Sequence, residues 1–267
     1  MHASLETRVR RGRVDKRVIL VDGETVVYQR HTLSGFRGPM PAGHHVMLKF
    51  PAASGSGAVS TSRFVRAQVF PGAFESPENR GYQALRPGAI FRSLARVPLF
   101  RGGTADLTRY PARKGFDDLV MLTADAGLPF AWTAVAFPGE RYAWFAIRDP
   151  RVLRHTLLWI SNGGRHYPPW SGRHEAVMGL EDVTSYFHLG LAESAGPNPL
   201  NRRGIPTALR LDPGKPTSIS HIMGVVAIPA GFDRVSRIRR MKGGIELVAA
   251  SGKRARCAVD LGFLDGS

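Results

Sequence analysis

The feature of this sequence that most restricts its fold is a succession of short apolar runs, each bounded by turn-forming residues. The runs DLVMLTA, PFAWTAVAFP, YAWFAIRD and TLLWISN follow one another between residues 118 and 162. Each has the length of a strand and is rich in β-branched and aromatic residues. The 30 Gly and 19 Pro are spread along the chain, which provides many turns and disfavours long helices. We therefore predict an all-β protein, a large antiparallel β-sandwich with few short helices.

Further elements are predicted on both sides of this region. Residues 13–33 have the pattern of a hairpin that turns at Asp22-Gly23. Other strand-like runs are VMLKFP, RFVRAQVF, VMGLEDV, SISHIMGVVAIP and GIELVAA. Two short helices are expected, one over DPRVLRHT at 149–156 and one around SYFHLGLAESA at 185–195. Residues 52–62 are predicted to form a flexible surface loop, and residues 71–118 an irregular excursion over the sheet. Since no internal repeat is found, residues 1–267 are interpreted as a single domain.

The charge of the chain favours anionic partners. Lys plus Arg is 37 and Asp plus Glu is 21, which gives a formal net charge of +16. The basic residues are mostly scattered singly, and Lys is scarce beside Arg, so we do not expect a nucleic-acid partner. A phosphorylated or acidic sugar is compatible with the same charge.

Cysteine content and the N-terminal segment restrict the compartment. Cys257 is the only cysteine, which excludes an internal disulfide, a redox pair and a cysteine metal cluster. Residues 1–16 are polar and basic, and no run is apolar and long enough to span a bilayer. The expectation is a soluble, cytoplasmic protein without contact to a membrane. No metal-ligand pattern and no glycine motif for a nucleotide is present, so we expect neither a metal nor a cofactor.

Two histidines stand where a loop becomes a strand. His44 and His45 follow PAG and precede the apolar run VMLKFP. An imidazole is suited to proton donation near neutral pH, and one at a strand end can project onto a sheet face. Two ordinary loop histidines would give the same pattern.

A long loop near the middle of the chain has the composition of a sugar site. Aromatic rings stack on the apolar face of a pyranose, while Asn, His and Arg bind its hydroxyl groups. The alternative is a large loop whose tryptophans close the core. The candidate substrate-binding residues in this region are Trp159, Asn162, Arg165, His166, Trp170 and Arg173, with Tyr167 and His174 beside them.

Glu181 lies within the predicted strand VMGLEDV. If its side chain faces the sheet, partial burial raises its pKa and makes it a better base. The alternative is that strand alternation turns it toward solvent, with Asp182 pointing the other way. The sequence leaves both orientations open.

Three segments together resemble the aldose 1-epimerase, or galactose mutarotase-like, superfamily. They are PAGHHVMLKFP, GFDDLVML and MGLEDV, which occur in the family's order, and the Pro213-Gly214 turn before SISHIMGVVAIP is similar to its closing strands. The resemblance extends over about residues 13–240. It implies a mutarotase-like supersandwich in which His45 is the general acid and Glu181 the general base on the anomeric centre of a free sugar. Asp117 and His44, in the matching segments, join the candidate substrate-binding residues.

The resemblance also implies limits and alternatives. Family members have further N-terminal strands with an Arg and a second His that hold the sugar, whereas 44 residues precede His45. We expect that this part is absent, supplied elsewhere or replaced by the Arg- and His-rich loop.

Alternatives to an epimerase are a carbohydrate-binding protein without catalysis, a hexose-phosphate epimerase that uses Arg165 or Arg173 for the phosphate, and a polyanion binder. If strands are missing, an exposed sheet edge makes a homodimer plausible.

For the acid and base to flank a sugar ring, they should lie several ångströms apart on a shared cleft. Carboxyl pairs in glycoside hydrolysis leave roughly 5 to 9 Å around a sugar. We therefore predict a similar separation between the His45 ring and the Glu181 carboxylate.

Overall fold

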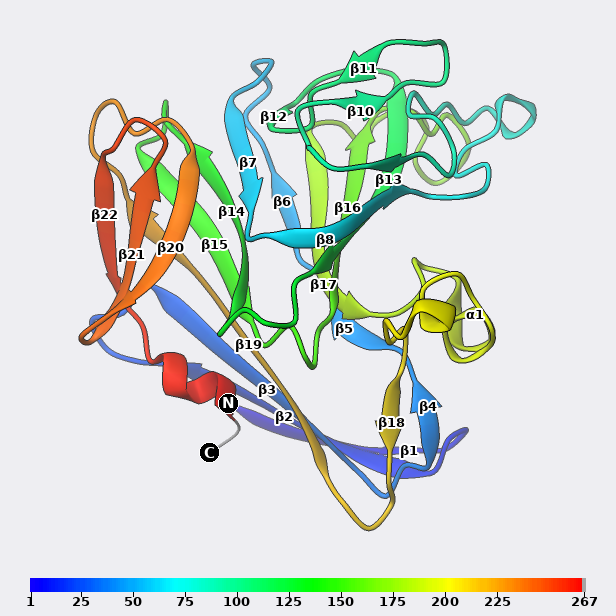
Figure 1. Cartoon of the computed structure of the whole chain (residues 1–267), viewed down its shortest axis with the longest axis vertical. Helices are drawn as coiled ribbons and strands as arrows, with labels where there is room; N and C mark the ends of the chain where they lie inside the picture. The colour runs from blue at the N-terminus through cyan, green and yellow to red at the C-terminus, as the bar shows by residue number, and fades with distance from the viewer. Residues whose placement is uncertain (266–267) are drawn as a thin grey trace.

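Two large antiparallel sheets face each other in the computed structural model, which describes residues 1–265 (Figure 1). The first sheet has eight strands, in the order β1 (His2–Thr7), β2 (Gly12–Leu20), β3 (Val26–Ser34), β19 (Thr217–Ala227), β15 (Tyr142–Arg148), β14 (Ala131–Phe137), β7 (Gly57–Thr61) and β12 (Arg109–Tyr110). The second has seven, in the order β5 (Ala42–His44), β17 (Val177–Thr184), β16 (His155–Asn162), β13 (Phe116–Ala124), β8 (Phe64–Val69) and β9 (Ile90–Phe91), with β6 (Met47–Lys49) also paired to β17. This arrangement confirms the predicted all-β sandwich.

Smaller elements surround the two sheets. A three-stranded sheet of β20 (Val235–Met241), β21 (Gly244–Ala249) and β22 (Arg254–Ala258) lies on the left in Figure 1. Two strand pairs are β10 (Val97–Pro98) with β11 (Thr104–Ala105), and β4 (Gly38–Met40) with β18 (Leu209–Leu211). The helical segments are α1 (Gly190–Ala195) and the 3-10 turns Pro77–Asn79, Asn201–Arg203 and Leu261–Asp265.

The middle of the eight-stranded sheet is buried on both faces. Trp144 packs toward the seven-stranded sheet with Leu158 and Leu180. Its neighbour Phe145 points to the opposite face and packs with Ile238 of the three-stranded sheet. A strand covered on both faces needs apolar residues at every position, which explains why β14 and β15 are continuous apolar runs rather than alternating ones.

Most predicted strands are confirmed, but three segments differ from expectation. The helix predicted over residues 149–156 is wrong: residues 149–153 form a turn, and His155 begins β16, which pairs with β13 and β17 on its two sides. The loop predicted over residues 52–62 contains β7, whose small side chains allow close packing. A Cβ at Gly57 would lie 2.4 Å from the Phe50 ring, so small residues are required there. The predicted second helix is present only as α1.

Three further sequence expectations concern the assembly, the surroundings and the domain organisation of the protein. β1 forms an edge of the eight-stranded sheet, and the homodimer that such an edge favours stays a prediction. In the described part of the chain, no helix has the length and hydropathy that a bilayer crossing requires. The single-domain organisation of residues 1–267 also stays a prediction.

A buried carboxylate joins the two large sheets. Asp182 of β17 accepts hydrogen bonds from Thr156 at 2.8 Å and from His221 of β19 at 3.0 Å, and it forms an ion pair with Arg148 of β15 at 2.7 Å. Arg148 also donates to Thr156 and to the Leu153 carbonyl. Burial by itself raises the pKa of Asp182, but Arg148 and the two hydrogen bonds outweigh burial and lower it. The carboxylate is therefore ionised and fully satisfied between the sheets.

This ion pair should be essential for stability. Removing one partner of a buried pair leaves an uncompensated charge, which costs about 3–5 kcal/mol. We expect Arg148→Met to lower the free energy of unfolding by about that amount, as measured by urea denaturation. Arg63→Met is the matched control, because Arg63 pairs with Asp125 at the surface and the Arg63 side chain is 72% exposed. Its expected cost is below about 1 kcal/mol, and equal small losses in both variants would contradict the assignment.

Candidate functional site

His45 and Glu181 lie in contact because two short strands pair with the same edge of β17. β6 pairs with the residues before Glu181, and β5 pairs with the residues after it. β5 places His44 opposite Asp182, and β6 places Met47 opposite Gly179. The connection between β5 and β6 therefore passes beside Glu181, where the Leu180 N–H donates to the Val46 carbonyl. His45 Nε2 lies 3.3 Å from Glu181 Oε1. An imidazole and a carboxylate distant in the sequence thus meet on the outer face of the seven-stranded sheet.

The two side chains have different access to solvent. The His45 side chain is 61% exposed, whereas that of Glu181 is 11% exposed. Burial raises the pKa of Glu181, and the charge of His45 lowers it in part. Gly179 provides the space for this carboxylate, because a Cβ there would lie 2.6 Å from Glu181 Oε1. Of the two orientations left open by the sequence, Glu181 faces outward but is largely covered, and Asp182 faces inward.

The predicted separation of roughly 5 to 9 Å is wrong for this pair. The distance is 3.3 Å because His45 comes from a segment hydrogen-bonded directly to the strand that carries Glu181. Both groups nevertheless lie on one face of one sheet, so neither is separated from the other by the thickness of the sandwich.

Trp159 is the centre of an aromatic and cationic cluster next to this pair. On β16 it lies opposite Gly179, and its ring contacts those of His45, Trp170 and His174 at centroid distances of 6.1, 5.7 and 5.5 Å. The Arg165 guanidinium lies over the ring of Trp159 at 4.9 Å and over that of Trp170 at 5.1 Å. These distances are in the range of cation–π attraction. The long loop after β16 is therefore folded back over the sheet face that carries Glu181.

Two buried carboxylates fix this loop. Asp117 accepts hydrogen bonds from the Gly164 N–H at 2.7 Å and from Ser161 Oγ at 2.6 Å. Glu75 forms a 2.6 Å ion pair with Arg165, and burial raises the pKa of Glu75 despite that cation. The Tyr167 hydroxyl donates to Glu75 as well. Sequence reasoning missed Glu75, since it lies in the irregular segment 71–118 where no periodic pattern marks it.

Other predicted site residues lie apart from the Trp159 cluster. His44 points to the inner side of the sheet and stacks on His221 at 4.4 Å. Asn162 is buried and holds the loop through the Ala112 carbonyl and the Ala176 N–H. His166 is exposed and packs on Tyr82, and Arg173 is exposed. The structure therefore brings together His45, Glu181, Trp159, Trp170 and Arg165, with Asp117 behind them.

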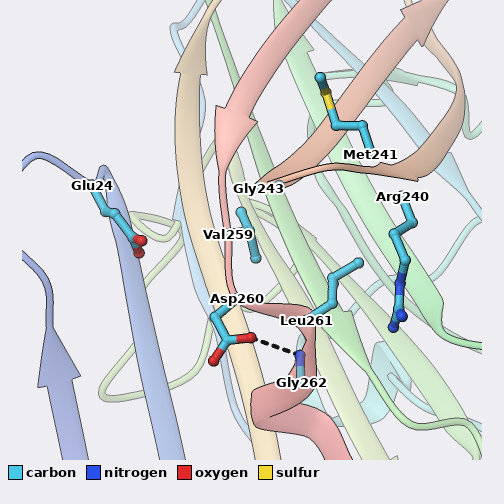
Figure 2. A pocket seen from close by; sticks show the side chains of 9 residues that line it. Glu24, Arg240, Met241, Gly243, Val259, Asp260, Leu261 and Gly262 are labelled. Atoms are coloured by element: carbon cyan, nitrogen blue, oxygen red, sulfur yellow. Dashed lines mark hydrogen bonds between the residues drawn. The ribbon is translucent and has the colours of Figure 1, made fainter.

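Two cavities are formed by residues other than His45 and Glu181. One of about 860 Å³ is lined by Tyr82, Phe100 and Phe116, and also by Glu75, which connects it to Arg165. His45, Glu181 and Trp159 are not among its lining residues, so the pair does not belong to this cavity. A second hollow of about 400 Å³ lies among Glu24, Arg240 and Asp260, where the Gly262 N–H donates to Asp260 (Figure 2).

The second hollow has no residue from the seven-stranded sheet among its described lining residues. It is therefore a separate feature from the His45–Glu181 pair. Across residues 1–265, no group of three or more His, Cys, Asp or Glu side chains is arranged to hold a metal ion.

Comparison with known proteins identifies the architecture. No protein family and no curated protein matches the chain. A candidate aldose 1-epimerase from Klebsiella pneumoniae subsp. pneumoniae is similar in structure, with 14% identity and a TM-score of 0.52, over 84% of this chain and 50% of that protein. A candidate aldose 1-epimerase from Escherichia coli K12 has 13% identity and a TM-score of 0.55, over 84% of this chain and 64% of that protein. The match thus spans between half and just under two thirds of those structures. The chain has the fold of aldose 1-epimerase-like proteins.

Proposed function

We propose that this chain binds a free sugar on the outer face of the seven-stranded sheet and interconverts its anomers with Glu181 and His45. The observation that carries the proposal is the 3.3 Å contact between an exposed imidazole and a largely buried carboxylate beside Trp159. The similarity in fold to candidate aldose 1-epimerases supports the same reading.

The chemistry requires one proton acceptor and one proton donor. Ionised Glu181 takes the proton of the anomeric hydroxyl while protonated His45 donates a proton to the ring oxygen. The bond between the anomeric carbon and the ring oxygen breaks, and the anomeric carbon becomes a carbonyl. After rotation about the adjacent carbon–carbon bond, the two proton transfers run in reverse and the ring closes with the opposite configuration. General acid–base assistance of this kind contributes about 10²–10⁴-fold.

The short distance within the pair suits this reaction. The ring oxygen and the anomeric hydroxyl oxygen are bonded to the same carbon, so the two atoms that exchange protons are close neighbours. An acid and a base 3.3 Å apart can therefore reach both oxygens from one side of the sugar. This differs from the arrangement expected from the sequence, in which the two groups flank the ring.

The surroundings support a sugar as the ligand. In this proposal, Trp159, Trp170 and Arg165 form the wall beside the reacting carbon, and Asp117 holds that wall through Ser161 and Gly164. A hexose phosphate would need Arg173 for its phosphate, because Arg165 is already paired with Glu75 and lies 3.7 Å from Asp117.

A second candidate function is carbohydrate binding without catalysis. It is favoured by the extent of the structural match, since this chain spans between half and just under two thirds of the candidate aldose 1-epimerases, and the same fold can host binding without catalysis.

Polarimetry separates the two candidates. With freshly dissolved single anomers of several aldoses, we expect the wild-type chain to accelerate mutarotation, and His45→Ala and Glu181→Gln each to lower kcat/KM by about 10²–10⁴-fold. The matched controls are His2→Ala and Glu140→Gln, which change exposed residues away from the pair and should retain activity. Sugar binding seen by tryptophan fluorescence, with equal rates in the wild type and both site variants, would leave only the non-catalytic function.

The pH dependence of the proposed activity should follow the ionisation of Glu181. The base must be ionised, and burial raises its pKa, so activity is expected to fall on acidification with a midpoint above the ordinary glutamate pKa of about 4.3. Because the charge of His45 lowers the pKa of Glu181, His45→Ala should move the titration of the Glu181 carboxyl to higher pH. Carbon NMR of a labelled glutamate side chain measures the titration of Glu181 in the wild type and in His45→Ala, and mutarotation rates over the same pH range measure the activity. A titration unchanged by His45→Ala would show that the two groups are not coupled.

A further inference from the structure

A polar cavity lies where β7 and β12 of the eight-stranded sheet, β20 of the three-stranded sheet and the segment after β9 come together. Its volume is about 500 Å³, within the range of small-ligand sites. Arg92, Arg109 and Arg234 line it together with Ser60 and Ser93. We propose that this cavity binds the phosphate group of a small phosphorylated ligand. The inference does not depend on the sugar site, which lies on the seven-stranded sheet.

The strand register explains why these side chains face the same space. β12 pairs with β7 so that Arg109 lies opposite Ala58, a residue that packs toward the three-stranded sheet. Alternation along β7 places Ser60 on the same face as Ala58. Arg234 immediately precedes β20, the strand of the three-stranded sheet next to this face, and Arg92 follows β9. Three arginines from three separate segments thus line one cavity.

Ser60 is a buried hydroxyl that lacks a partner. It is 5% exposed, it lines the cavity, and its Oγ has no hydrogen-bond partner among residues 1–265. A buried polar group without a partner costs about 1–3 kcal/mol, so a native structure normally pairs it. A ligand oxygen in the cavity would accept the Ser60 proton and remove that cost.

The arginines are available to an anion. Within the described chain, none of Arg92, Arg109 and Arg234 forms an ion pair with a carboxylate, and no Asp or Glu is among the described lining residues. Of the nearest acidic residues in sequence, Asp106 accepts from Thr108, and Asp233 accepts from the Ser251 N–H. The described lining residues of the cavity therefore include positive but no negative side chains.

The number of donors matches a phosphate rather than a carboxylate. Ser93 Oγ accepts from the Ala95 N–H and keeps its own proton for donation, whereas Ser236 already donates to the Val248 carbonyl. Three guanidinium groups and two free hydroxyls give more donors than a two-oxygen carboxylate can use. Arginine is also the side chain whose planar fork fits phosphate oxygens in pairs.

Isothermal titration calorimetry of the full chain tests this site. The probes are inorganic phosphate, glycerol 3-phosphate and uncharged glycerol, with ionic strength held constant by chloride. We expect saturable binding of the two phosphates and none of glycerol. Arg109→Gln and Arg234→Gln should each weaken binding about tenfold, and Ser60→Ala about fivefold, as expected for charged and neutral hydrogen bonds.

The matched control is Arg17→Gln, an exposed arginine of β2 that removes the same charge elsewhere. It should change phosphate affinity less than twofold. Thermal unfolding adds a second readout: without phosphate Ser60→Ala should be at least as stable as the wild type, and with phosphate the wild type should gain more stability than the variant. Absence of phosphate binding, equal weakening by Arg17→Gln, or binding only of long polyanions such as duplex DNA would overturn the proposal.

Discussion

The contact of the buried, ionised Asp182 carboxylate with Arg148 and His221 is the interaction on which the rest of the architecture depends. The carboxylate lies between the two large sheets, and its partners Arg148 and His221 come from the sheet opposite its own. Apolar packing between sheets tolerates small shifts, whereas a buried charge tolerates only the positions that satisfy it. We therefore regard this contact as the reason why β17 has one position against β15 and β19 of the facing sheet.

The position of β17 also determines which of its side chains lie on the outer face of the seven-stranded sheet. Because successive side chains of a strand alternate, an inward Asp182 requires an outward Glu181. β5 pairs His44 with Asp182, so the same constraint fixes where the chain leaves β5 and where His45 lies. The acid–base pair of the proposed reaction is thus the outer counterpart of the polar contact inside the sandwich. Its short separation follows from strand pairing.

The two polar surfaces differ in how the protein uses its cations. Around Trp159, Arg165 is neutralised by Glu75 and held by aromatic rings, so it forms part of the wall of the site. Around Ser60, three arginines line a cavity without a carboxylate among its described residues. The high net charge of the chain is therefore balanced locally at the proposed sugar site and left unbalanced at the proposed phosphate site.

The sequence by itself determined the fold class, because short apolar runs separated by Gly and Pro are typical of many short paired strands. It also determined the strand that carries Glu181 and the junction of loop and strand at His45, and it singled out Trp159, Trp170 and Arg165, since local composition marks them. It predicted a helix at 149–156 that the structure does not have, because strand pairing on both sides of β16 outweighs the local preference for a helix. Nor could it find Glu75 or the strand at Gly57–Thr61, because neither carries a periodic pattern. Only the tertiary structure decided which way Glu181 and Asp182 point and how close His45 comes, because these depend on pairing between segments far apart in the chain.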